Sequence, residues 1–515
     1  MSSFLLLSIV VVYFLVLLAV AWYTSRNANN DSFFIGNRNS NWMLVAFGMI
    51  GTSLSGVTFV SVPGKVGTAS FGYFQVVIGY FIGYFIVAYV LLPLYYRLNL
   101  TSIYNYLDKR FGLTAYKTGA LFFIISRTIG ATARLYLVIN VLQIFILNSI
   151  GVPFWLTTLV ILLMILLYTF EGGVKTIVFT DTLQTTFMLL GLIVCVICIL
   201  NSLHFSLPTA WQTMSNKGYT QIFNTDVNSG GFWLKQIIGG AFITVGMTGL
   251  DQEMMQKNIS VKTLGDSQKN MVTFSTIMVL VNLLFLVLGG LLYLFAAQNN
   301  LHSKGDDLFP AIALGTESST PFFPPYVAVI FIIALISALF PSADGAITAI
   351  TSSFCIDMLG LKRNSNRTEQ QEKRTRMTVH LTFTVIFFLC VLLFKWINDK
   401  SIIDIILTVA GYTYGPLLGL FGFGILTKRI VSKGAPVVII SLITPVMSYL
   451  LSAYVPKWFN GYQIGVELIL INGLLTFAGL YLISNKPNNI AGQNNVSHLP
   501  DRQTGIARMG TDEKQ

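Results

Sequence analysis

Apolar runs of about 20 residues recur from one end of the sequence to the other, and each is long enough to cross a bilayer as a helix. The chain of 515 residues is 54% hydrophobic and 10% charged, with a mean hydropathy of +0.70. These values exceed what the core of a water-soluble protein requires. The runs predict an all-α membrane protein with about thirteen transmembrane helices. The expected spans are 3–23, 41–64, 69–96, 118–148, 152–170, 175–203, 233–252, 271–298, 323–358, 379–396, 403–427, 435–454 and 463–485.

Basic residues are distributed unevenly between the two sets of loops. Of the 32 lysines and arginines, 23 fall in the loops of one side or in the tail, and seven fall in the opposite loops or at span ends. Cytoplasmic loops carry the excess of basic residues in membrane proteins. The asymmetry therefore predicts an external amino terminus, a cytoplasmic carboxyl terminus and a cytoplasmic loop at 359–378. The net charge of +11 needs no nucleic-acid partner to explain it.

No soluble domain is expected outside these spans. Residues 1–485 are predicted to form one transmembrane domain, and residues 486–515 a polar, flexible cytoplasmic tail. The spans contain no mid-membrane histidine and no nucleophile beside a recognisable base, which argues against an enzyme. A solute sensor or channel is the alternative from another class, but a sensor normally carries an output domain. The expected partners are a small solute and the lipid bilayer, and no feature calls for an obligate protein partner.

The span 41–64 is interrupted by small and hydroxylated residues. It reads NWMLVAFGMIGTSLSGVTFVSVPG, with Ser53-Leu54-Ser55-Gly56 at the centre and Pro63 near the end. Residues of this kind support close helix packing in membranes. Alternatively, they mark an unwound segment, whose free carbonyls are tolerated at membrane depth only where they line a polar cavity.

Four stretches of the sequence together resemble one family of membrane proteins. They are Ser53-Leu54-Ser55-Gly56 leading to Val62-Pro63-Gly64, Glu171-Gly172-Gly173-Val174-Lys175 leading to Thr180-Asp181-x-x-Gln184, Asp251-Gln252-x-x-x-Gln256-Lys257, and Gly415-Pro416-Leu417-Leu418-Gly419-Leu420-Phe421. In this order and spacing they are similar to the sodium/solute symporters, which include carriers of proline, galactose, sialate, iodide and vitamins. The motifs are nearest to those of the sialate-type bacterial members.

The resemblance implies a leucine-transporter-type fold. That fold has two inverted five-helix repeats, here at about 41–203 and 233–427, with one extra helix before them and two after. The first core helix of the family is broken, which favours an unwound segment at 53–56. The expected location is the cell membrane, and the resemblance to bacterial members implies a bacterial inner membrane.

The resemblance also implies Na+ as the coupling ion, bound between the first and eighth core helices. Na+ is a hard cation and prefers oxygen ligands. One position departs from the family pattern, because Pro341 stands where a second hydroxyl is usual. Proline frees the carbonyl of Ser337, which would replace the lost oxygen; alternatively, Pro341 only kinks the helix and the site is weak or absent. Carried over by position, the ligands are the carbonyls of Gly51, Leu54 and Ala338 and the hydroxyl of Ser342.

Four charged residues are expected at membrane depth, where each needs a partner or an aqueous cavity. Asp181 matches an aspartate that helps to bind a second Na+ in some members of the family, and Asp344 stands where some members have serine. Two facing carboxylates repel unless a cation, a proton or an arginine lies between them. Three interpretations are open: a second Na+ site, a proton site, or a static ion pair with Arg127 or Arg134.

Arg134 is the main candidate for binding the solute. It lies two helical turns after Arg127 and one turn after Gly130, the position that matches the carboxylate-binding arginine of the sialate carriers. A guanidinium group binds a carboxylate through two parallel hydrogen bonds, so the favoured solute is an organic anion such as sialate. The other candidates for substrate binding are Ser55, Thr58, Gln75, Thr244 and Tyr412.

Several of these candidates also have a structural interpretation. Gln75 then forms an interhelical hydrogen bond, Thr244 bonds its own helix backbone, and Tyr412 anchors its helix at the membrane interface. Asp251 and Glu253 are expected to form ion pairs of a gate or loop.

The residues together predict a secondary active symporter. It would couple the inward flow of Na+ to the uptake of a small polar solute by alternating access. An H+-coupled carrier and a carrier of a neutral sugar are the alternatives within the same fold.

Overall fold

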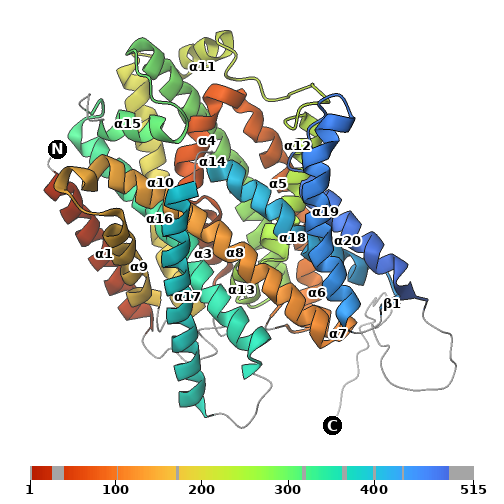
Figure 1. Ribbon diagram of the computed structural model, residues 1–515. Helices are drawn as coiled ribbons and strands as arrows, with labels where there is room; N and C mark the ends of the chain where they lie inside the picture. Colours follow the sequence, from red (N-terminus) through yellow and green to blue (C-terminus); the bar gives the residue numbers. More distant parts are fainter. Residues whose placement is uncertain are drawn as a thin grey trace, which may run out of the picture.

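Long α-helices make up most of the protein in the computed structural model (Figure 1). The structure describes residues 3–25, 40–100, 102–169, 173–315, 321–361, 368–397, 402–431 and 434–486. Within these ranges the strands are the two-residue β1 (Ile430–Val431) and β2 (Ser484–Asn485), which pair antiparallel. The predicted tail lies outside the described residues from 487 onwards.

Every predicted span contains a helix, which confirms the all-α prediction. Nine helical stretches of the described chain are long and apolar enough to cross a membrane, and three shorter apolar helices accompany them. The number of thirteen crossings stays a prediction. The main helices are α1 (Ser3–Ser25), α3 (Trp42–Ser53), α4 (Gly56–Ala69), α5 (Tyr73–Ile86), α6 (Leu92–Arg97), α7 (Asn105–Phe111), α8 (Leu113–Leu142), α9 (Phe154–Thr169), α10 (Gly173–Ser202), α11 (Leu207–Asn216), α12 (Trp233–Thr244), α13 (Gln252–Ile259), α14 (Leu264–Gln298), α15 (Leu308–Leu314), α16 (Pro325–Ser353), α17 (Glu369–Ile397), α18 (Ile402–Leu426), α19 (Ala435–Trp458) and α20 (Leu468–Leu482).

The interruption of the span 41–64 is a break between α3 and α4. α3 ends at Ser53 and α4 begins at Gly56, and between them Leu54 has φ −86° and ψ 73°, outside the helical region. Ser55 is extended, with ψ 177°. A Cβ on Gly56 would lie 2.2 Å from Cγ2 of Val138 in α8, so a glycine is required for this close approach. The prediction of an unwound segment is confirmed at 54–55.

α16 lies inside the bundle. In the most apolar 18-residue stretch of α16, 78% of the residues are buried. The corresponding shares are 28% in α1 and 22% in α19. α16 packs against α10, α8, α3 and α4. Pro341 lies within this helix, which continues through it to Ser353. The expected Na+ ligands Ala338 and Ser342 are therefore held by a helix that is surrounded by protein.

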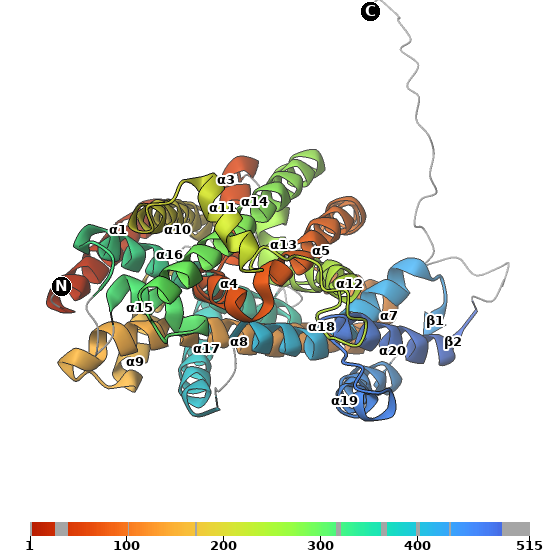
Figure 2. The ribbon, with the colours of Figure 1, turned by 90° about the horizontal axis from the view of Figure 1, so that it is seen from above.

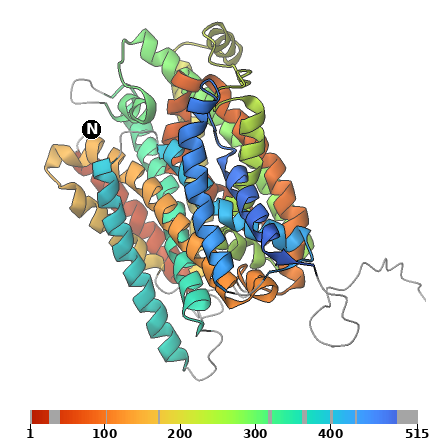
Figure 3. The same ribbon diagram turned by 45° about the vertical axis from the view of Figure 1, so that its right-hand side comes forward.

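α1, α17 and α19 lie at the periphery of the bundle. Viewed from above, α1 and α19 stand at opposite ends of the molecule (Figure 2). α17 runs along the outside and extends beyond its neighbours (Figure 3). It exposes large apolar side chains, among them Leu381, Leu389 and Trp396. An apolar surface of this extent is stable against lipid rather than water.

The structure differs most from the predicted spans at the start of α17, and α14 and α8 also begin earlier than predicted, at Leu264 instead of 271 and at Leu113 instead of 118. α17 begins at Glu369, before the predicted start at 379. The added residues are mostly glutamate, glutamine, lysine and arginine, which favour helix without lipid around them. A hydropathy criterion does not detect such an extension, because it recognises only the apolar part of a helix.

Candidate functional site

A cavity of about 90 Å³, here called the central cavity, lies at the break between α3 and α4. Ser53, Leu54 and Ser55 line it, so residues of the unwound segment form part of its wall. α8 contributes Arg127 and Arg134 from another side. The remaining polar residues of the wall are Thr52, Thr58, Tyr73, Tyr80, Tyr84, Thr244, Thr248 and Asn282.

Arg134 lines the central cavity without an ionic partner. No hydrogen bond or ion pair joins its guanidinium group to any other residue that the structure describes. The space next to it is open, because a Cβ on Gly130, one turn earlier, would meet no atom within 4 Å. An arginine at membrane depth costs about 2.5–3.5 kcal/mol on insertion scales, so one without a protein partner is a candidate for binding an anion.

Arg127 belongs to a closed cluster of charges, here called the inner cluster. It forms an ion pair with Glu253, and its Nε lies 3.9 Å from Oδ2 of Asp251. The hydroxyl of Tyr414 donates a hydrogen bond to the same oxygen of Asp251 over 2.7 Å. None of these four side chains is more than 4% exposed. The prediction that Asp251 and Glu253 form ion pairs is confirmed.

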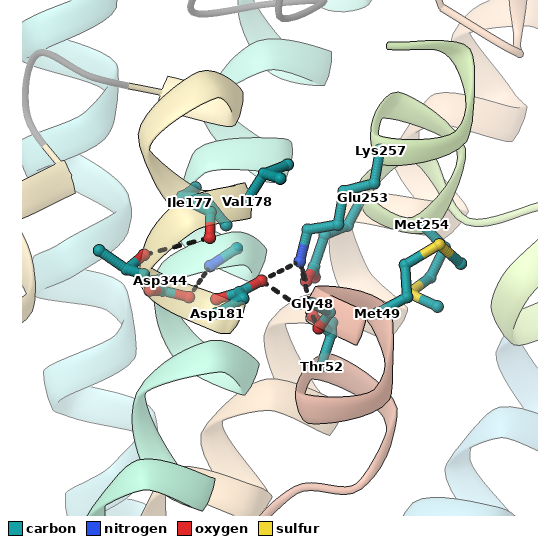
Figure 4. Close-up of polar contacts among 12 residues, drawn as sticks. Gly48, Met49, Thr52, Ile177, Val178, Asp181, Glu253, Met254, Lys257 and Asp344 are labelled. Atoms are coloured by element: carbon teal, nitrogen blue, oxygen red, sulfur yellow. Dashed lines mark hydrogen bonds and ion pairs between the residues drawn. The ribbon is translucent and has the colours of Figure 1, made fainter. Parts of the chain in front are cut away.

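Asp181 pairs with a lysine from α13. Nζ of Lys257 lies 2.7 Å from Oδ2 of Asp181 and 2.6 Å from the hydroxyl oxygen of Thr52. Thr52 in turn donates to Oδ2 of Asp181 over 3.1 Å. Figure 4 shows the lysine side chain extending from its helix towards both partners. The alternative in which Asp181 pairs with Arg127 or Arg134 is wrong, because Lys257 is its cation.

Asp344 is fully buried in α16, close enough to Asp181 for their charges to interact (Figure 4). Tyr168 donates to its Oδ2 over 2.7 Å, and the amide N–H of Gly345 donates to its Oδ1 over 2.5 Å. No ion pair joins Asp344 to a described lysine or arginine. The arginine pairing is therefore wrong for Asp344 as well. A second cation or proton site at the two aspartates stays a prediction.

The expected Na+ ligands lie on elements that meet at the break. Gly51 is in the last turn of α3, Leu54 is in the break, and Ala338 is in α16, which packs against both α3 and α4. The carbonyl oxygen of Ala338 lies 4.0 Å from the Cβ position of Gly56, the first residue of α4. This arrangement brings backbone oxygens from α16 to the break, and oxygen donors of this kind fit Na+.

The hydroxyl of Ser342 is suited to the same cation. It donates its hydrogen to the carbonyl of Leu339 over 2.9 Å, which leaves the oxygen lone pairs available. Pro341 has no N–H for the carbonyl of Ser337 one turn earlier. The part of the Ser337 carbonyl in binding stays a prediction, as does the ligand set itself.

The predicted substrate residues divide between two cavities. Ser55, Thr58 and Thr244 line the central cavity together with Arg134. Gln75 and Tyr412 line a second cavity of about 510 Å³, here called the outer cavity. The structure therefore brings four of the six candidates together and places the other two apart from them.

The outer cavity adjoins the central cavity and lies on the side that the charge count predicts to be external. Tyr73 and Leu407 line both cavities. The ends of α4 and α18 meet in its wall through an ion pair between Lys65 and Asp404.

Gln75 is held by several hydrogen bonds at the edge of the outer cavity. Its side-chain amide donates to the carbonyls of Gly72 and Gly231, and its oxygen accepts from the N–H of Asn224. These bonds tie α5 to the loop before α12. The structural interpretation of Gln75 predicted an interhelical hydrogen bond, whereas its bonds run to the preceding turn and to this loop.

Sequence reasoning missed two kinds of site residue. Lys257 falls between the predicted spans 233–252 and 271–298, and its position in the motif that starts at Asp251 is the one signal for it in the sequence. Tyr80 and Asn282 line the central cavity but lie in strongly apolar spans without a local motif. Only the packing of α5 and α14 around the break shows that they face it.

Comparisons with known proteins give a consistent result. The profile of the Sodium:solute symporter family matches residues 33–441. The sodium/sialic acid symporter NanT of Aliivibrio fischeri is 25% identical over 474 residues, with 89% of this chain and 90% of NanT covered. The sodium/sialic acid symporter SiaT of Proteus mirabilis is 24% identical over 483 residues, with 89% and 92% covered.

Solved structures of two transporters resemble the fold. A substrate-bound, outward-open Na+-coupled sialic acid symporter aligns with a TM-score of 0.79 at 20% identity, covering 93% of this chain and 97% of that structure. Mhp1, a nucleobase-cation-symport-1 family transporter, aligns with a TM-score of 0.55 at 14% identity, covering 89% and 95%. These likenesses confirm the predicted leucine-transporter-type fold.

Proposed function

Since the chain belongs to the sodium:solute symporter family, we propose that it couples the inward flow of Na+ to the uptake of a small organic anion whose carboxylate binds Arg134. Membership makes the protein a multi-pass membrane transporter and not an enzyme. The names of NanT and SiaT give sialic acid, a carboxylic acid, as their solute. That chemistry supports an anionic cargo here.

The observation that carries the proposal is the unpaired guanidinium group in the central cavity. Arg134 shares this cavity with Ser55, Thr58 and Thr244, which supply hydroxyl groups for the polar part of a solute. A carboxylate would satisfy the arginine through two charge-assisted hydrogen bonds. A neutral solute would leave the charge uncompensated at membrane depth.

The break between α3 and α4 would couple the binding of Na+ to that of the solute. Gly51, Leu54, Ala338 and Ser342 would hold Na+, and the ion would fix α16 against the break. Leu54 and Ser55 also line the central cavity, so the same ion would order part of the solute site. Two ligands that stabilise one arrangement raise each other's affinity by the same factor.

A binding experiment on the purified protein tests the proposal. Thermal unfolding is measured with a series of organic acids and sugars, with and without Na+, because a ligand stabilises the state that it binds. We expect an acid to raise the unfolding temperature only when Na+ is present. The neutral methyl ester of the same acid is the matched control and should have no effect.

Variants of Arg134 identify the binding group. Arg134→Lys keeps the charge but loses the two-pronged geometry, and should weaken binding of the acid about ten- to a hundredfold, as expected for a lost charge-assisted hydrogen bond. Arg134→Lys should not change the unfolding temperature of the protein without ligand. Equal binding of the acid and its ester, unchanged in Arg134→Lys, would reject the anionic cargo and favour a neutral sugar.

The orientation in the membrane is proposed from the distribution of basic residues. The amino terminus would be external, and the loop at 359–378 and the carboxyl terminus would be cytoplasmic. Single cysteines placed in that loop should resist a membrane-impermeant reagent in intact cells. Labelling of the loop without permeabilisation would reverse the orientation.

A further inference from the structure

We infer that the ammonium group of Lys257 is a resident cation that takes the place of a second Na+ at Asp181, so that the protein binds a single Na+ in each transport cycle. The inference rests on the proposed Na+-coupled function and defines its ion stoichiometry. It concerns the polar core between α3, α10 and α13 (Figure 4).

The ammonium group of Lys257 forms two hydrogen bonds and a longer ion pair. Three oxygens surround it: Oδ2 of Asp181 at 2.7 Å, the hydroxyl oxygen of Thr52 at 2.6 Å and Oε1 of Glu253 at 3.5 Å. The lysine is 3% exposed and the other side chains no more than 2%. Carboxylate and hydroxyl oxygens are also donors that suit a buried Na+. The ammonium group therefore already uses the donors that would define a Na+ site.

A second Na+ at these oxygens would lie directly beside the ammonium group. Like charges that close repel strongly where water is excluded. The ammonium group is covalently tethered and cannot leave, so Na+ is excluded from its position while α13 stays in place. Asp181 keeps one buried oxygen, Oδ1, without a hydrogen-bond partner. That oxygen and the neighbouring carboxylate of Asp344 define an alternative location for a second Na+.

The position of Lys257 on α13 links this cation to the central cavity. The same short helix carries Glu253, the ion-pair partner of Arg127, and Met254, which lines the cavity. Lys257 thus anchors α13 to α10 through its ion pair with Asp181. The tethered charge neutralises Asp181 in every cycle without being transported.

Direct counting of bound ions tests the inference. Equilibrium dialysis of the purified protein with radioactive Na+ and saturating solute gives the number of ions per chain. We expect about one ion for the wild-type protein. In Lys257→Met the side chain keeps its approximate length but loses its charge, and Asp181 is left uncompensated. That variant should bind about two ions, whereas Lys257→Arg should still bind about one.

A double variant keeps the test decisive if Lys257→Met does not fold. Lys257→Met/Asp181→Asn replaces the buried pair by neutral side chains, a change that proteins tolerate better than removal of one partner. It should bind the same single Na+ as the wild-type protein. Two ions in the wild-type protein and one in the double variant would overturn the inference and place the second ion at Asp181 Oδ1 and Asp344. Absence of any bound Na+ in the wild-type protein would instead reject the proposed Na+-coupled function.

Discussion

Arg127 and Arg134 lie on the same helix, two turns apart, and both line the central cavity, but they differ in their ionic partners. Arg127 is enclosed by Glu253, Asp251 and Tyr414 in the inner cluster. Arg134 lines the central cavity and has no hydrogen bond or ion pair to a described residue. Both carry the cost of a charge at membrane depth. The partner, rather than the depth, therefore separates a structural charge from a functional one.

The neighbouring helices explain this difference. α13 and the residue before it bring two carboxylates to the level of Arg127. α18 contributes Ile406, Val409 and Ala410 to a small adjoining cavity that both arginines line, and none of these three side chains can pair with a cation. The second arginine is therefore left for a ligand.

The largest expected effect is the loss of stability in Arg127→Ala. The substitution leaves Glu253 and Asp251 buried without their cation, which costs about 3–5 kcal/mol. Chemical unfolding in detergent micelles measures the free energy of unfolding. Arg134→Ala is the matched control on the same helix, and we expect it to leave this free energy unchanged within about 1 kcal/mol, since it breaks no pair.

The double variant Arg127→Ala/Glu253→Gln tests the cause. Neutralising Glu253 removes part of the uncompensated charge, so the double variant should be more stable than Arg127→Ala alone. A greater loss in Arg134→Ala than in Arg127→Ala would reverse the roles assigned to the two arginines.

A smaller effect is expected when the free guanidinium group is moved along the helix. Arg134→Gly should weaken binding of the organic acid about ten- to a hundredfold, because the charge-assisted hydrogen bonds are lost. Adding Gly130→Arg to this variant should raise its affinity for the acid about tenfold. The space around Gly130 is open, and positions 130 and 134 line the same small cavity. Calorimetric titration measures both changes. No recovery in the double variant would indicate that the solute needs the arginine at 134.

Sequence reasoning predicted the parts of this protein that have a local signature. The apolar runs predicted the helices. Ser53-Leu54-Ser55-Gly56 was compatible with either close packing or a break, and the resemblance to the symporter family favoured the break that the structure has. The separation of Arg127 from Arg134 could not be predicted. Their spacing places them on one face, and only the packing of α13 and α18 distinguishes them.

Pairing between helices that are far apart in the sequence was the main feature that could not be predicted. Asp181 and Lys257 are joined across α10 and α13, and a charge-only argument offered the arginines of α8 as equally suitable partners. For Gln75 and Tyr412, the sequence likewise could not show which cavity each residue lines. Both lie in polar surroundings, but the packing of α5, α12 and α18 assigns them to the outer cavity.

Ser342→Ala tests an available oxygen in the same way that the arginine variants test an unpaired charge. We expect it to have a moderate effect on Na+ binding. One coordinating oxygen disappears, and a single hydrogen-bond-like interaction is worth about 0.5–1.5 kcal/mol, so the Na+ concentration for half-maximal binding should rise about two- to tenfold. Ser352→Ala in the same helix is the matched control, because its hydroxyl bonds the carbonyl of Thr348. Na+-dependent thermal shifts measure the change. An identical Na+ dependence in both variants would exclude the Ser342 hydroxyl as a ligand.

The smallest effect is expected at Tyr412, which we propose contacts the solute in the outer cavity before it reaches Arg134. Tyr412→Phe removes a hydroxyl from that cavity and leaves the ring that packs against Tyr449. Equilibrium binding should stay within about twofold, because the bound carboxylate lies in the central cavity and an isolated surface polar change is worth at most about 0.5 kcal/mol. Thr58→Val is the contrasting change of similar size, and its missing hydroxyl should weaken binding by about two- to tenfold because Thr58 lines the central cavity. A larger loss in Tyr412→Phe than in Thr58→Val would move the solute site from the central cavity to the outer one.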